Sequence, residues 1–249
     1  MNYIGITETS DPCFHPDWET RLLAANIIIS KEVSFEMTEK LLVVQHRVIF
    51  HHTVTGQGGT VLEPGVALPE YEFKKFVTLV ERGFPLSHYV LRLDPVILFD
   101  KDCQDNVVKV LDLWHDYLKD KGEKVRCRVS VVDLYPHVLE RLDADGRIKP
   151  LWRTFKAPPA VFRRLEKILS GYTDTFSFEC CAEQDLNADY IEHCGCASMK
   201  DIQILGQATE EYENPDTPQR KSCMCIGKKQ MLRGKPGRCA HKCLYCFWR

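Results

Sequence analysis

Short apolar segments and amphipathic segments alternate along most of the chain. The apolar segments are rich in β-branched residues and are bounded by turn-forming residues, a pattern typical of buried strands. We therefore predict six strands, over residues 3–7, 26–30, 48–54, 88–98, 125–134 and 175–181.

The amphipathic segments between these strands predict helices. After Pro69, for example, Phe73, Phe76, Val77 and Val80 recur at helical spacing, and proline is favoured in the first turn of a helix. The predicted helices span about 16–25, 69–82, 102–121 and 160–169, with a short helix and a connecting loop within 137–159.

Strand and helix alternate about six times, which predicts an α/β fold with parallel strands joined by right-handed crossovers. Six repeats favour an open or partial (β/α)6 TIM-like barrel over a full eightfold one. We predict that residues 1–206 form this barrel and that residues 207–249 form a basic, cysteine-rich tail that closes its mouth.

Polar side chains gather where the predicted strands end. In parallel sheets these ends share one rim, where barrels bind their ligands. A single member of the set could instead be a satisfied core group or part of a rim salt bridge. As a set they predict a cavity for a cofactor or substrate, with the candidate contacts Glu8, Ser30, Lys31, Thr53, Arg92, Asp94, Asp133, Glu179 and Glu183.

The chain has 249 residues and 12 cysteines. It shows no basic and apolar leader and no apolar run long enough to span a membrane. We therefore expect a protein of the reducing cytoplasm with no membrane contact, whose cysteines are buried thiols, catalytic groups or metal ligands rather than disulfides. Cys13, Cys103 and Cys127 are predicted to be packing thiols.

Charge is unevenly divided along the chain. Residues 217–249 carry nine lysines and arginines and no acid, so a net charge of −2 overall leaves −11 for the remainder. Such a basic segment could stabilise an anionic metal cluster, contact phosphates or simply be solvated.

The terminal stretch carries Cys239, Cys243 and Cys246 at C-x3-C-x2-C spacing, with Tyr245 before the third cysteine. This spacing lets one loop present three thiolates to three irons of a [4Fe-4S] cluster, so that the fourth iron can bind a small molecule. Radical S-adenosylmethionine enzymes use this arrangement. A short cysteine cluster can also hold structural zinc.

A second set of cysteines predicts another metal site. Cys223 and Cys225 cannot close a site alone, but together with Cys181 and Cys196 they could hold an auxiliary [4Fe-4S] cluster or a zinc ion. The alternative is that all four are buried free thiols.

The sequence resembles a family of uncharacterised bacterial proteins, a domain of unknown function whose members end in a C-L-Y-C-Y-A type motif. The matching stretches are residues 91–98, 131–135, 181–183, 191–193 and 219–225 together with the terminal triplet. The family's basic S-R-R-T-D is replaced by Thr7-Glu-Thr-Ser-Asp11, and of F-W-T-K-N-P only Lys31 is kept. Substrate contacts at this end should therefore differ.

The triplet is also locally similar to that of spore photoproduct lyase, a radical S-adenosylmethionine enzyme that acts on DNA. Such enzymes usually carry the triplet after the first strand, whereas here it ends the sequence. A circular permutation, or a tail that folds back over the barrel mouth, would restore the same geometry.

Together these features predict a radical S-adenosylmethionine enzyme with a [4Fe-4S] cluster, whose 5'-deoxyadenosyl radical abstracts hydrogen from a small molecule, a nucleotide or a nucleic-acid base. Its electron donor would be a flavodoxin or a ferredoxin. Whether it is a lyase, an isomerase or an oxidoreductase stays open. The alternatives are an iron-sulfur electron-transfer or sensing protein and a zinc-stabilised binding module.

Overall fold

The computed structural model describes residues 2–8, 11–212, 223–232 and 239–248. Its centre is one parallel sheet of eight strands in the order β7-β6-β5-β4-β3-β2-β1-β8. The strands are β1 (Ile4–Ile6), β2 (Asn26–Ser30), β3 (Val48–Thr53), β4 (Tyr89–Val96), β5 (Val125–Val131), β6 (Phe176–Cys180), β7 (Ile191–His193) and β8 (Lys229–Met231).

The α-helices are α1 (Phe35–Val44), α2 (Pro69–Glu81), α3 (Lys101–Leu118), α4 (Pro136–Asp145), α5 (Pro159–Leu169) and α6 (Met199–Ile204). Short 3-10 segments cover Pro12–Phe14, Pro16–Arg21, Gln45–Arg47, Leu86–His88, Ser170–Tyr172 and Thr209–Glu211. Local sequence sets several helix ends. The Asp100 side chain caps α3 by accepting from the Cys103 amide (2.8 Å), and Gly146 ends α4 with a positive φ of 72°.

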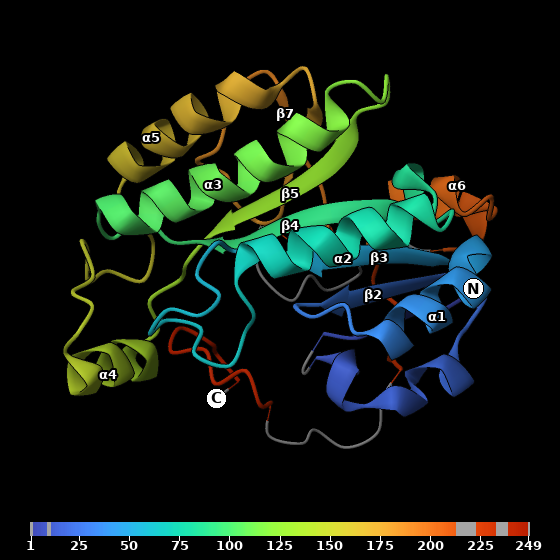
Figure 1. Cartoon of the computed structure of the whole chain (residues 1–249), viewed down its shortest axis with the longest axis horizontal. Helices are drawn as coiled ribbons and strands as arrows, with labels where there is room; N and C mark the ends of the chain where they lie inside the picture. Colours follow the sequence, from blue (N-terminus) through green and yellow to red (C-terminus); the bar gives the residue numbers. More distant parts are fainter. Residues whose placement is uncertain (1, 9–10, 213–222, 233–238, 249) are drawn as a thin grey trace.

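Apolar side chains cover both faces of the sheet. One face packs against α1, α2, α3 and α5, which lie along it in Figure 1, with Phe50, Phe76 and Trp114 in the core. Across the other face, the smaller Ile27 and Ile49 meet a second apolar cluster that includes side chains of α6. Side chains alternate between the two faces of a strand, so residues near the carboxyl ends of the strands can place polar side chains on this second face.

All six predicted strands are present, and successive strands lie side by side in one parallel sheet. The fold is therefore α/β, compatible with a TIM-like or related arrangement. The sheet has eight strands rather than the six predicted. Strands β7 and β8 were missed because they have three residues each, mostly exposed or half-buried, and leave no apolar run in the sequence.

Two helical predictions also needed correction. The helix expected over 16–25 is a 3-10 segment that ends at Arg21. Helix α1 was missed because its apolar residues do not form one stripe, with Phe35 and Val43 both exposed to solvent. Within the described part of the chain, no helix is both long and apolar enough to cross a membrane.

Candidate functional site

A cavity of about 820 Å³ opens at the carboxyl ends of β1 to β5. Its wall combines strand-end residues with residues of the C-terminal stretch 239–248, which we call the terminal segment. Seven of the nine predicted contacts line it, namely Glu8, Ser30, Lys31, Thr53, Arg92, Asp94 and Asp133. The thiols of Cys239, Cys243 and Cys246 line the same cavity.

The terminal segment is held against the loop between β3 and α2 and against α4. The Gly65 amide donates to the His241 carbonyl (3.1 Å), and the Leu244 amide donates to the Leu62 carbonyl (2.9 Å). From α4, Arg141 Nε donates to the Leu244 carbonyl (3.0 Å). Figure 1 shows this red segment beside α4. The cavity is therefore built from parts of the chain that are distant in sequence.

Glycine is needed at position 65 because the two backbones approach closely. A Cβ atom placed there would lie 2.5 Å from the Ala240 carbonyl oxygen and 2.9 Å from the His241 Cα atom. Only a residue without a side chain allows this approach.

Asp11 anchors the terminal segment to the strand ends. Its buried carboxylate accepts from the Ser30 hydroxyl, from the Lys31 amide (2.6 Å) and from His241 Nε2 (2.8 Å). His241 Nδ1 faces the Gly65 carbonyl at 3.0 Å. Since both ring nitrogens of His241 face acceptors, both must carry a proton. Burial alone would lower the pKa of His241, but the Asp11 carboxylate outweighs it and the pKa is raised.

A second anchor joins Lys31, Glu63 and Tyr245. Lys31 Nζ lies 2.7 Å from Glu63 Oε1 and 3.0 Å from the Tyr245 hydroxyl, which itself donates to Glu63. Burial lowers the pKa of Lys31, but Glu63 and the neighbouring Cys243 raise it above its ordinary value. The cavity wall therefore keeps a half-buried cation next to the cysteine triplet.

The three thiols of the triplet influence one another electrostatically. The pKa of Cys243 is raised to about 12, mainly by burial, and Cys246 and Cys239 add to this effect while Lys31 opposes it. A metal centre bound by the triplet would replace the thiol protons and stabilise the thiolates.

Arg92 on β4 connects this cavity with the second cysteine set. Its guanidinium pairs with Asp94, and Asp94 accepts from the Ser130 hydroxyl. Arg92 Nη2 also lies 3.7 Å from Cys196 Sγ. One side chain thus contacts both a cavity carboxylate and a cysteine of the other group.

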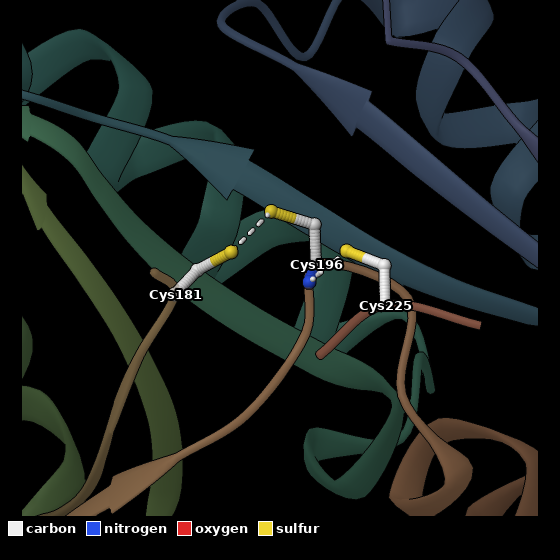
Figure 2. Close-up of side chains that lie close together, drawn as sticks. All are labelled: Cys181, Cys196 and Cys225. Carbon is white, nitrogen blue, oxygen red and sulfur yellow. Dashed lines mark hydrogen bonds between the residues drawn. The ribbon is translucent and has the colours of Figure 1, made fainter. Parts of the chain in front are cut away.

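The second set of cysteines also comes together. The Sγ atoms of Cys181, Cys196 and Cys225 all lie within 4.8 Å of one another, and Figure 2 shows the three side chains converging from three separate segments. Cys181 and Cys196 are 3.1 Å apart at sulfur. The thiol of Cys223 is in hydrogen-bonding range of Cys225, which lowers the pKa of Cys223 to about 6.

Glu179, predicted to contact a ligand, does not line the cavity. It is buried beside Arg128 (2.6 Å) and Lys200 (2.9 Å). Burial raises its pKa, but these cations, Arg128 first, bring it down to about 2. Its contacts are those of a structural ion pair.

Glu183, the other predicted contact outside the cavity lining, accepts from the Val131 amide at 2.9 Å. Its pKa is raised to about 7, chiefly by burial and further by Asp133 and Asp94. Glu183 therefore contacts the backbone of the cavity residue Val131 but does not itself line the cavity.

Sequence reasoning missed Asp11, Glu63 and His241 as site residues. His241 lies within the cysteine triplet, which was a usable signal, whereas Asp11 and Glu63 lie in loops and acquire their roles only through docking of the terminal segment. The sulfur of Cys13, which we predicted to be a packing thiol, lies within 4.8 Å of ligand atoms of Asp11 and His241.

The fold and this site define a parallel α/β protein with a cavity at the carboxyl ends of its strands, lined in part by a cysteine-rich terminal segment. The chain belongs to the family DUF1848, a domain of unknown function, whose model matches residues 17–248. This agrees with the predicted resemblance to such a family. Comparison with curated proteins and with solved structures gave no match, and the likeness to spore photoproduct lyase stays a prediction.

Proposed function

We propose that the protein is a radical S-adenosylmethionine enzyme whose [4Fe-4S] cluster is held by Cys239, Cys243 and Cys246. The observation that carries this proposal is that these three thiols line one cavity together with the polar ends of five parallel strands. A cluster held by three thiolates keeps one iron open toward that space.

The residues present fit this group and its ligand. The cavity volume of about 820 Å³ falls in the range of small-molecule sites, roughly 300–1,000 Å³. Within the part of the chain that the structure describes, Thr53 Oγ1 and Arg92 Nε are buried without a hydrogen-bond partner. Buried polar atoms of this kind favour a polar ligand in the cavity.

The bound cluster would supply one electron to S-adenosylmethionine, and the resulting 5'-deoxyadenosyl radical would remove hydrogen from the substrate. The chain's own residues would bind and orient. Lys31 and Arg92 offer cationic donors for carboxylates or phosphates, and Glu8 and Asp133 offer acceptors for amino and hydroxyl groups. The terminal segment, packed through Phe247 on Tyr135 with ring centroids 4.7 Å apart, would exclude water from the reacting atoms.

We further propose that the sheet is a partial TIM-like barrel of the radical S-adenosylmethionine type with a permuted triplet. Its support is that β8 pairs in parallel with β1. The terminal triplet therefore follows a strand next to the first one, although it stands at the other end of the sequence.

For the substrate we propose a nucleotide or a nucleic-acid base. Lys31, Arg92 and Lys242 on the cavity wall offer positive charge to phosphates. A flavodoxin or ferredoxin would supply electrons in the cytoplasm, where a reduced cluster can be maintained.

Anaerobic purification tests the proposal. The wild type and the control Cys103→Ala, a buried thiol of α3, should contain iron and sulfide in equal amounts, and S-adenosylmethionine should change the electron paramagnetic resonance spectrum of the reduced cluster. Cys243→Ala should lose both signals. A cluster whose spectrum ignores S-adenosylmethionine would favour an electron-transfer or sensing protein, and zinc as the only metal would favour a binding module; either overturns the proposal.

A further inference from the structure

The four cysteines of the second set lie where the two edges of the sheet approach each other. The edge strands are β7 and β8. The segment after β7 contacts the segment before β8, since the Ile226 amide donates to the Ala197 carbonyl at 2.9 Å. The contact is close, because a Cβ atom on Gly195 would lie 2.5 Å from Cys225 Cα.

We propose that Cys181, Cys196, Cys223 and Cys225 bind one tetrahedral zinc ion that cross-links these two edges. The site would be structural and closed, with four thiolates and no open position for a substrate. It is separate from the terminal triplet and does not depend on the function proposed for that triplet.

The spacing of the sulfurs favours a single ion over a second cluster. Zinc–sulfur bonds of about 2.3 Å at tetrahedral angles put neighbouring sulfurs about 3.8 Å apart. Here the Sγ atoms of Cys181, Cys196 and Cys225 lie within 4.8 Å of one another, and two of them are 3.1 Å apart. In a four-iron cluster each thiolate binds a different iron, which holds the sulfurs farther apart.

Cys223 would be the fourth ligand, because it lies two residues before Cys225 and its thiol interacts with that of Cys225. The thiol of Cys223 contacts that of Cys225, and Cys225 in turn contacts Cys181 and Cys196. Three of the four sulfurs, those of Cys181, Cys196 and Cys225, are already grouped within 4.8 Å of one another, and metal binding would draw the Cys223 thiol in beside them.

The surroundings supply the outer contacts that tetrathiolate zinc needs. Four thiolates around Zn²⁺ carry two negative charges. Arg92 Nη2 lies 3.7 Å from Cys196 Sγ, and the Cys196 amide donates to Cys225 Sγ at 3.1 Å. Lys229 interacts electrostatically with the same two cysteines. Such donors neutralise and orient metal-bound thiolates.

The zinc would also support the cavity wall. Arg92 contacts Cys196 on one side and pairs with the cavity residue Asp94 on the other. Fixing the four cysteines would therefore limit the positions open to Arg92, without any contact between zinc and substrate.

The variant Cys239→Ala/Cys243→Ala/Cys246→Ala removes the terminal triplet and isolates the second site. Purified from medium with both iron and zinc, it should retain about one zinc ion per chain and no iron-sulfur absorption. Adding Cys225→Ser should release the zinc, whereas adding Cys103→Ala should not. Iron with sulfide, or no metal, in the triple variant overturns the proposal.

X-ray absorption at the zinc edge of the intact wild-type protein makes the test independent of variant folding. We expect four sulfur neighbours at about 2.3 Å. Nitrogen or oxygen neighbours, or the absence of zinc, would contradict the proposal even if the protein proves to cleave S-adenosylmethionine.

Discussion

The hydroxyl of Tyr245 ties the terminal segment to the cavity wall, and Tyr245→Phe removes that hydroxyl alone. It donates to Glu63 and accepts from Lys31 at 3.0 Å, and the Tyr245 side chain is buried. The ring and its packing stay in place in the variant. Any change therefore reports on this polar anchor.

The magnitude follows from these contacts. A hydrogen bond to a charged group contributes about 1.5–3 kcal/mol. We count this contribution once, because Lys31 and Glu63 still pair with each other at 2.7 Å after the hydroxyl is removed. The free energy for opening of the terminal segment should fall by that amount, which is roughly a 10- to 150-fold larger open population.

Alkylation of Cys243 measures this population in reduced, metal-free protein. Cys243 is 6% exposed and should react mainly from the open state. Its rate, followed by mass spectrometry, should rise by the predicted factor in Tyr245→Phe. The control is Tyr71→Phe, whose side chain is 57% exposed, and the buried Cys127 of β5 reports global unfolding. Equal Cys243 rates in Tyr245→Phe and wild type would refute the reasoning.

Two further predictions concern Gly65, which contacts the terminal segment, and the buried carboxylate of Glu179. In Gly65→Ala the new Cβ atom would lie 2.5 Å from the Ala240 carbonyl oxygen, so the terminal segment should be displaced and Cys243 alkylation should speed up at least tenfold, about 1.4 kcal/mol. The control Gly171→Ala, where a Cβ atom meets nothing within 4 Å, should leave the rate unchanged. Unchanged alkylation in Gly65→Ala would count against the docked geometry. Glu179 has its pKa lowered from 4.5 to about 2 by its cationic partners against the effect of burial, so its stabilisation is full above about pH 4.5 and is lost as the pH falls toward 2. The unfolding free-energy difference between wild type and Glu179→Gln should therefore shrink by about 3 kcal/mol between about pH 6 and pH 2 in denaturant titrations, and a constant difference would contradict this.

The sequence predicted the fold wherever local pattern decides it. Strands β1 to β6 are apolar runs, and their sequential order in a parallel sheet follows from the crossover connections between them. Strands β7 and β8 were not predicted because their own residues carry no apolar pattern, unlike the equally short but fully buried β1.

Some residues of the candidate site could likewise be predicted from local sequence, and others could not. The two cysteine groups could be proposed from residue type and spacing, because closely spaced cysteines are common ligands of metal ions and clusters. Glu179 was assigned to a ligand because the strand register that sets it opposite Arg128 on β5 is not readable from the sequence. Asp11 and Glu63 take their roles from contacts with His241 and Tyr245, more than 180 residues away along the chain.

Formation of 5'-deoxyadenosine tests most directly the claim that the terminal triplet builds a radical site. Anaerobic protein with confirmed cluster, dithionite and S-adenosylmethionine should yield this product, and Cys243→Ala should yield none. Fully loaded wild-type protein that leaves S-adenosylmethionine intact would contradict the proposed function.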